Sequence, residues 1–289
     1  QIDTYNRDGY LIVPSLLTDT EIDNFVDYER EPKPEGWRQD LRHHVEDEKW
    51  RHLATHPNVV KAVEQLIGGR PRVVQTMYME KHPSHDTNVG GQGVALHQDF
   101  HYLPCEPDTL IACWIALSDT DPENGGLVVV PGSHKDGLYK THKNENAEEH
   151  DSWEIDYLMR DREGKEWVEH MYSFEIEGLD IDRLEKLTVP KGSGVIFDSL
   201  TIHGSYANRT KDRVRIAFAT HYIREDSWMF RADVQDVMEV VSVGGRRSEV
   251  GGRRSKVEDN YSMEIAVPKT YRKCTAPTNF VLEAPSTCS

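Results

Sequence analysis

The sequence predicts a mainly β fold with flanking helices, in which antiparallel strands form a closed sandwich or barrel. Two observations support this class. Short apolar or alternating segments of strand length recur at 109–117, 127–130, 189–197 and 213–222. Turn-forming residues separate them, most densely in 121–126, where Asp, Pro, Asn and two Gly occur together. Short strands punctuated by such turns are typical of antiparallel β domains.

Two helices are predicted before the strands. The segment 17–25 begins a helix in which Thr18 is the N-cap, and Glu21 follows it at the spacing of a capping box. The segment 56–67 has the apolar periodicity of an amphipathic helix, and Gly68 ends it. We expect both helices to pack outside the strands and to carry no chemistry.

The composition limits the possible partners and compartments. The chain carries a net charge of -16 and has a pI of about 5.3, which argues against nucleic acids and anionic membrane surfaces as partners. No apolar run approaches the ~20 residues of a membrane span. The four cysteines form no CxxC pair or dense framework, so we expect free thiols and a reducing, cytoplasmic location.

Two short elements far apart in the chain carry the most informative chemistry. His97 and Asp99 are two residues apart, so on one extended strand they would point to the same face. A further imidazole, from His203, would complete three ligands on one side of an ion and leave the other side open. Two His and one carboxylate with open positions are the donor set of non-haem Fe(II) oxygenases. The His-x-Asp triplet alone is weak, because 14 His and 50 acidic residues produce such triplets by chance.

Several motifs, taken in order, resemble the phytanoyl-CoA dioxygenase family of Fe(II)/2-oxoglutarate-dependent oxygenases. They are the opening segments 6–13 and 17–25, the run HQDFHYLP at 97–104, the run ENGGLVVVPGSH at 123–134, and His203-Gly-Ser with its trailing arginine. The resemblance extends from about residue 4 to residue 225. It implies a double-stranded β-helix of jelly-roll or cupin-like type, closed as a barrel.

The resemblance also implies roles for individual residues. His97, Asp99 and His203 match the iron ligands, and the carboxylate at Asp99 implies hydroxylation or another oxidation, because related halogenating enzymes carry a small residue there. The distal carboxylate of 2-oxoglutarate requires a cation, and arginine binds carboxylates with two parallel hydrogen bonds. Arg215, 12 residues after His203, matches the family's cosubstrate arginine best. Arg213, on the same strand face, is the alternative.

Other positions match residues that line the cosubstrate pocket in the family, namely Gln98, Trp114, Ser205, Thr76 and Met77. For Trp114 and Met77 the alternative is a place in the apolar core. His101, predicted on the face shared by His97 and Asp99, is either a substrate contact or a hydrogen-bonding group behind the ligands.

We expect one catalytic domain at 1–230, with a lid insertion at about 139–188, and a C-terminal extension at 231–289 that includes a Gly/Arg-rich loop at 244–255. In the insertion the regular recurrence of strand-like segments stops, and Asp and Glu outnumber Lys and Arg by 15 to 7. Its aromatic and Met content favours an ordered lid that selects the substrate, and a solvated surface excursion is the alternative. The residues that favour a lid are Trp153, Tyr157, Met159, Trp167, Met171, Tyr172 and Phe174.

The sequence therefore predicts an Fe(II)- and 2-oxoglutarate-dependent dioxygenase that consumes O2, hydroxylates or otherwise oxidises a small-molecule substrate, and releases succinate and CO2. Desaturation or ring formation stays open. The alternatives are an acyl-CoA 2-hydroxylase like the family's namesake and a non-catalytic cupin-like binding protein. The acidic insertion argues against binding of CoA phosphates. A structural zinc site is less favoured, because such sites are usually closed by four ligands.

Overall fold

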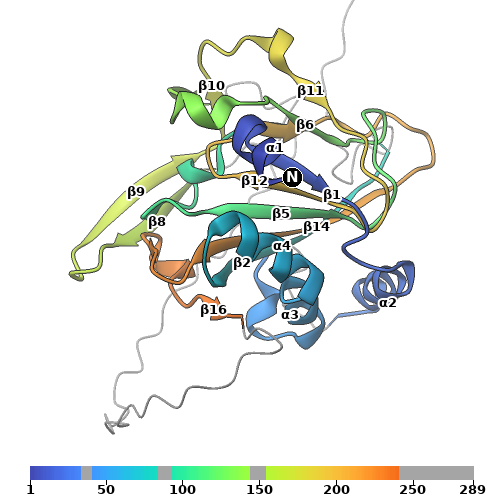
Figure 1. Ribbon diagram of the computed structural model, residues 1–289, viewed down its shortest axis with the longest axis horizontal. Coiled ribbons are helices and arrows are strands. Elements are labelled where there is room, and N and C mark those ends of the chain that lie inside the picture. The colour runs from blue at the N-terminus through green and yellow to red at the C-terminus, as the bar shows by residue number, and fades with distance from the viewer. Residues whose placement is uncertain (34–40, 84–92, 144–153, 241–289) are drawn as a thin grey trace, which may run out of the picture. The chain divides into compact units, whose positions relative to one another are not determined.

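The computed structural model describes residues 1–33, 41–83, 93–143 and 154–240, which lie in one compact unit, Gln1–Gly245 (Figure 1). Two antiparallel sheets form its core. The larger sheet has the strand order β1 (Tyr10–Val13), β12 (Gly194–Asp198), β5 (Ile111–Ala116), β14 (Arg215–Arg224), β2 (Pro71–Lys81) and β16 (Met238–Glu239). The smaller sheet has the order β11 (Glu185–Lys186), β6 (Leu127–Val129), β13 (His203–Ser205) and β3 (Val94–His97).

The predicted mainly β, jelly-roll fold is confirmed. Strands from distant parts of the chain alternate in the larger sheet, where β12 lies between β1 and β5, and β14 lies between β5 and β2. Among the described residues no ladder joins the two sheets, so the barrel is open at their edges and is a sandwich of two sheets. This alternation brings strands from the two halves of the sequence together around one interior.

Strand β5 shows why its sequence is apolar throughout. Cys113 and Ile115 pack in a cluster with residues of the helices, whereas Trp114 and Ala116 pack in a second cluster that includes Val129 of the smaller sheet. A strand that is buried on both faces has no polar alternation. We call the face of the larger sheet that carries Trp114 the inner face, because it packs against the smaller sheet.

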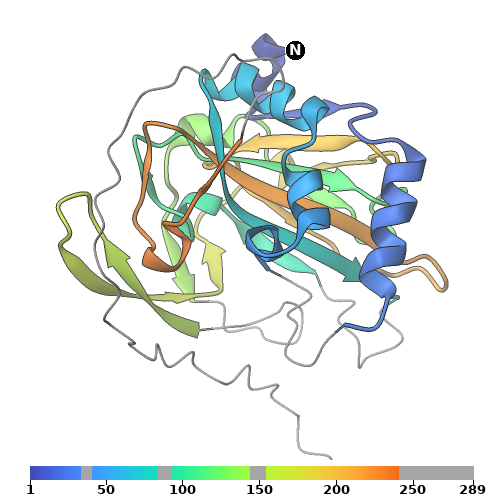
Figure 2. The same cartoon turned by 90° about the horizontal axis from the view of Figure 1, so that it is seen from below.

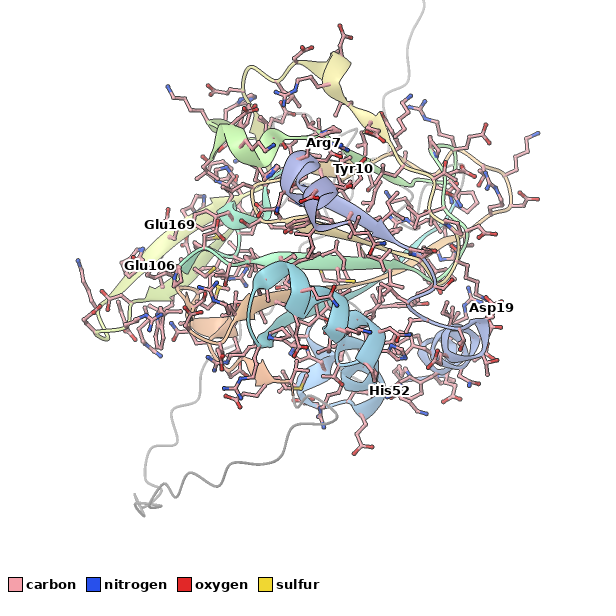
Figure 3. The ribbon with its side chains drawn as sticks, in the orientation of Figure 1. Arg7, Tyr10, Asp19, His52, Glu106 and Glu169 are labelled. Atoms are coloured by element: carbon pink, nitrogen blue, oxygen red, sulfur yellow. The ribbon has the colours of Figure 1, made fainter. Side chains whose placement is uncertain are left out.

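The helices cover the opposite face of the larger sheet. They are α1 (Ile2–Asp8), α2 (Asp19–Arg30), α3 (Glu48–Ala54) and α4 (Pro57–Ile67), and Figure 2 shows α2 to α4 lying across that sheet. The predicted capping box is present at the start of α2, and α4 ends at Gly68 with a φ of 71°. Asp19 and His52 project outward from this layer (Figure 3). The apolar sides of the helices contribute Phe25, Trp50 and Val63 to the helix-side core.

The segment predicted as an insertion contains strands, so the expectation that strand structure stops there was wrong. Strand β7 (Thr141–Lys143) pairs with β10 (Phe174–Ile176), and β8 (Glu154–Arg160) forms a hairpin with β9 (Glu166–Tyr172). Met159 and Met171 are buried on one face of the hairpin, while Glu169 lies at its surface (Figure 3). The polar and apolar alternation of this hairpin is broken, because the cross-strand partners Leu158 and Val168 are apolar but lie on the exposed face.

The remaining elements are short. They are the 3-10 helices η1 (His43–Val45), η2 (Asp99–His101), η3 (Ser133–Asp136), η4 (Ile181–Arg183) and η5 (Ala232–Val234), and the paired strands β4 (Cys105–Glu106) and β15 (Trp228–Met229). None of the helices in the described residues has the length and apolar character needed to cross a membrane. The Gly/Arg-rich loop at 244–255 and Trp153 lie outside the described residues.

Candidate metal centre

His97, Asp99 and His203 meet at the edge of the smaller sheet. His97 is the last residue of β3, and His203, the first residue of β13, is its direct cross-strand partner. Asp99 does not lie on the strand, as the sequence suggested, but begins the 3-10 helix η2. Gln98 between them keeps an extended backbone, with φ −115° and ψ 129°. The Asp99 carboxylate therefore still reaches the side chain of His97.

The three side chains offer one ligand atom each, and these atoms all lie within 4.8 Å of one another. Asp99 Oδ1 is 3.5 Å from His97 Nε2 and 3.7 Å from His203 Nε2. Metal bonds of ~2.0–2.2 Å place neighbouring ligand atoms about 3 Å apart. A small contraction therefore lets one ion contact all three.

Hydrogen bonds on the far side of each ring prepare the imidazoles for a metal. His97 Nδ1 donates to the carbonyl of Ala95 at 2.8 Å, and His203 Nδ1 donates to the carbonyl of Thr201 at 3.0 Å. A carbonyl only accepts, so each Nδ1 carries the proton and each Nε2 presents its lone pair to the site. This outer contact is typical of metal-binding histidines. The donor set and the tautomers both fit a divalent first-row metal such as Fe(II).

Burial and mutual contact set the charge of the site. Burial lowers the pKa of His203 to about 4, so this ring is neutral at neutral pH. Burial opposes the ionised form of Asp99, but the nearby imidazoles His203, His221 and His97 outweigh it and hold the pKa of the carboxyl well below its usual range. An ionised carboxylate and a neutral imidazole are the forms that bind metals.

Arg215 is a buried cation on the inner face. Its side chain is 2% exposed, and burial lowers the pKa of the guanidinium to about 10. Nε donates to the carbonyl of Gly125 at 3.2 Å, and Nη1 has no hydrogen-bond partner among the described residues. The guanidinium carbon lies 5.7 Å from the centre of the Trp114 ring. A buried guanidinium with an unused donor is suited to a carboxylate ligand.

Arg213 has a different environment. It precedes β14, is exposed, and pairs with Asp121 at 2.6 Å and with Glu123 at 3.5 Å. Its charge is already neutralised at the surface. Of the two arginines that the sequence offered, only Arg215 projects into the interior.

Lys81 was missed by the sequence analysis. It ends β2 opposite Arg215 on β14, and it is 5% exposed. Its Nζ donates to Ser205 Oγ at 2.8 Å and to the carbonyl of Tyr206 at 2.6 Å. Ser205 thus lies beside Lys81, whose cross-strand partner is Arg215. The sequence did contain an indication of Lys81, because the two-residue period of a strand places it on the same face as the predicted pocket residue Met77.

The other predicted pocket residues divide between the two faces. Met77 and Trp114 pack at the inner face, which leaves both their predicted roles and the core alternative open. Thr76, the neighbour of Met77 on β2, necessarily projects to the opposite face, where its hydroxyl lies 2.8 Å from His44 Nδ1. The structure therefore does not bring Thr76 into the interior between the sheets.

Gln98 and His101 also depart from the positions that a continuous strand would give them. The buried Gln98 amide donates to the carbonyls of Gly137 and Leu200 and accepts from the backbone N–H of Tyr139. Gln98 therefore connects the loop at Gly137 and Tyr139 with the loop at Leu200. His101 lies at the end of η2, so the shared-face argument no longer applies to it, and burial lowers the pKa of its ring.

His221 was also missed, although it lies against a predicted ligand. It lies on β14, three two-residue repeats after Arg215 and therefore on the same face of the strand. Its Nε2 lies 3.2 Å from Asp99 Oδ2. Phe197 packs on the ring of His203, with 4.2 Å between the ring centres. The His221 contact comes from a strand that is remote from Asp99 in the sequence, whereas Phe197 lies on the strand just before His203.

Solved structures of similar fold support the jelly-roll assignment. The chain resembles the non-heme alpha ketoglutarate dependent epimerase SnoN from nogalamycin biosynthesis with a TM-score of 0.56 and 19% identity, over 85% of this chain and 90% of that one. It resembles EctD from S. alaskensis, solved with 2-oxoglutarate and 5-hydroxyectoine, with a TM-score of 0.55 and 16% identity, over 78% of this chain and 75% of that one. At these identities the likeness concerns the fold.

Sequence comparison identifies the family. The family model for phytanoyl-CoA dioxygenase (PhyH) matches residues 5–217. The peroxisomal phytanoyl-CoA dioxygenase of Rattus norvegicus is 32% identical over 251 residues, which cover 77% of this chain and 67% of that protein. The corresponding protein of Homo sapiens is 29% identical over 255 residues, with the same two coverages. The chain therefore belongs to the phytanoyl-CoA dioxygenase family.

Proposed function

We propose that the protein is an Fe(II)- and 2-oxoglutarate-dependent dioxygenase that hydroxylates a small-molecule substrate and releases succinate and CO2. One observation carries the proposal: the cluster of His97, Asp99 and His203 accompanies a buried arginine, Arg215, whose Nη1 donor has no partner in the part of the chain that the structure describes. A three-ligand metal site and a carboxylate site are the two things that a 2-oxoglutarate-dependent enzyme needs.

Each part of the site has a separate task in this proposal. Bound iron and 2-oxoglutarate supply the activation of O2 and the oxidising power, which no side chain here possesses. His97, Asp99 and His203 hold the metal from one side. Arg215 binds the distal carboxylate of the cosubstrate, and the apolar strands around it exclude water, which strengthens that ion pair.

Lys81 and Ser205 support the carboxylate site. Since the Lys81 ammonium donates to Ser205 Oγ, the hydroxyl hydrogen of Ser205 is free to point to a bound anion. The neighbouring positive charge of Lys81 attracts the same anion. Trp114 covers one side of the Arg215 guanidinium and restricts its movement.

An anaerobic titration of the metal-free protein with Fe(II) and 2-oxoglutarate tests this function. We expect the weak visible charge-transfer band of the iron–cosubstrate chelate. Arg215→Ala should weaken 2-oxoglutarate binding, and Arg213→Ala is the matched control, because Arg213 is exposed and already paired with Asp121. If no band forms with folded protein and bound iron, the cosubstrate assignment fails and a non-catalytic binding role takes its place.

Hydroxylation of an acyl-CoA is the second candidate for the substrate. It is favoured by the rat and human relatives, which are named phytanoyl-CoA dioxygenases and match 77% of this chain. Succinate release should be compared for branched acyl-CoA thioesters and for the corresponding free acids. Release with the thioesters alone supports an acyl-CoA substrate, and release with the free acids alone excludes it.

We also propose a reducing compartment as the working environment. Cys105 and Cys113 are both buried free thiols, and burial raises the pKa of each to about 12, so neither forms a reactive thiolate at neutral pH. The mammalian relatives are named as peroxisomal, so the comparisons do not favour the cytoplasm over the peroxisome. Imaging of the tagged full-length protein beside markers of both compartments tests this point.

A further inference from the structure

The two carboxylate oxygens of Asp99 have different neighbours. Oδ1 faces the two predicted ligand imidazoles, at 3.5 Å from His97 Nε2 and 3.7 Å from His203 Nε2. Oδ2 faces the opposite way and accepts a hydrogen bond from His221 Nε2 at 3.2 Å. A metal that contacts both imidazoles therefore finds one oxygen of Asp99 available and the other already engaged.

His221 is held in place for this contact. It lies within β14, where Gln75 of β2 and Ala112 of β5 are its backbone partners on the two sides, and it is 6% exposed. Its Nδ1 has no hydrogen-bond partner among the described residues. The bond to Asp99 is thus the only hydrogen bond of the imidazole within the described part of the chain. A buried polar ring with a single partner points to a specific task for that partner.

The consequence concerns the number of positions left open on the metal. Three protein ligand atoms leave three positions of an octahedral ion open, which is what a chelating cosubstrate and O2 together require. If the carboxylate used both oxygens, it would occupy one of these positions. A hydrogen bond that engages Oδ2 keeps the carboxylate to one metal bond.

We infer that His221 is a positioning residue that makes Asp99 a one-oxygen metal ligand. The inference rests on the proposed function, since it presumes that the cluster binds a metal. His221 touches neither the metal nor the substrate in this account. It acts through Asp99, in the way that hydrogen-bonded neighbours of metal ligands tune affinity and geometry.

Two substitutions of His221 distinguish the effect of its hydrogen bond from the effect of its packing. His221→Leu fills similar space and removes the donor, whereas His221→Gln keeps an N–H that can reach Oδ2. The control is Phe218→Leu, on the same strand but in the helix-side core, which should lower thermal stability without touching the site. The full chain is titrated with Mn(II), and its anaerobic Fe(II)–2-oxoglutarate absorption band is recorded.

We expect His221→Leu to weaken Mn(II) binding by ~10–100-fold and to shift the absorption band. His221→Gln should restore both properties toward wild type, and Phe218→Leu should change only the melting temperature. Wild-type affinity and an unchanged band in His221→Leu would overturn the inference while leaving the proposed function intact. If the wild-type chain itself binds no metal, the proposed function fails and the inference fails with it.

A further variant covers the case in which His221→Leu does not fold. His221→Asn keeps a polar side chain, but its amide is too short to reach Asp99 Oδ2 from the same backbone position. It should therefore bind Mn(II) more weakly than His221→Gln. Equal, wild-type affinity of the Asn and Gln variants overturns the inference as well.

Discussion

Lys81 and Arg215 are cross-strand partners on β2 and β14, and both positively charged side chains are almost fully buried. Like charges on directly opposite residues normally destabilise a sheet. Here the Lys81 ammonium donates to Ser205 Oγ and the Tyr206 carbonyl, whereas Arg215 Nη1 finds no acceptor among the residues that the structure describes. A bound carboxylate would complete the arrangement, because it adds the negative charge that two adjacent cations require.

Lys81→Met should raise the KM for 2-oxoglutarate by about tenfold or more, because a hydrogen bond to a charged group is worth ~1.5–3 kcal/mol. The loss of the ammonium also frees Ser205 to change its rotamer. Steady-state kinetics with varied 2-oxoglutarate measure the effect. Lys191→Met, at a half-buried lysine that pairs with Asp23 far from this site in the sequence, is the control. An unchanged KM in Lys81→Met would show that Lys81 has only a structural role.

Gly125→Ala should impair the carboxylate site directly. A Cβ at Gly125 would lie 2.5 Å from Lys81 Cδ and 2.9 Å from the Tyr206 carbonyl oxygen, and the backbone has a φ of +88°. Gly164→Ala is a matched control, because Gly164 has a φ of +85° but no atom of the described residues lies within 4 Å of such a Cβ.

Both glycine variants should lose ~1–2 kcal/mol from backbone strain, as measured by urea unfolding. Only Gly125→Ala should also bind 2-oxoglutarate more weakly, because only there does the new methyl group displace Lys81. If the two variants have the same affinity for 2-oxoglutarate, the packing of Gly125 against Lys81 does not matter for the cosubstrate.

Thr76→Val should reduce stability without changing 2-oxoglutarate binding. The Thr76 hydroxyl bonds to His44 Nδ1 at 2.8 Å on the helix side of β2, and both groups are buried. Removal of the hydroxyl leaves the His44 nitrogen without this partner, which costs ~1–3 kcal/mol. Met77→Ala on the opposite face is the informative comparison. A higher KM for 2-oxoglutarate in Thr76→Val would mean that Thr76 lines the cosubstrate site after all.

His44 should make the folded state sensitive to mild acid. Burial lowers the pKa of this fully buried ring to about 4, whereas the unfolded chain titrates at ~6.5. Below pH 6.5 the unfolded state therefore binds a proton that the folded state does not, so stability falls as the pH falls toward 4. With these two pKa values, the free energy of unfolding falls by about 2 kcal/mol between pH 7 and pH 5.

A comparison of variants isolates this contribution from those of other groups. Urea unfolding of the wild type and of His44→Asn at pH 7 and pH 5 gives the difference that is due to His44. The loss between the two pH values should be smaller in His44→Asn by about 2 kcal/mol. An identical loss in both proteins would mean that the ring is protonated in the folded state.

The local patterns of the sequence accounted for much of the fold. The capping box at Thr18 and Glu21, the end of α4 at Gly68 and the apolar run of β5 all depend on neighbours within a few residues, and the structure contains each of them. The hairpin of β8 and β9 was missed, because the apolar Leu158 and Val168 on its exposed face interrupt the alternation that marks a half-buried strand.

The sequence by itself determined the chemistry that was available: a His-x-Asp triplet, a later histidine and two candidate arginines at suitable distances along the chain. Only the tertiary structure decided which groups meet. Strand pairing sets His203 opposite His97 and Lys81 opposite Arg215, and burial separates Arg215 from the surface-paired Arg213. The physical reason is that register and burial depend on contacts between residues 90 or more positions apart, which no local pattern encodes.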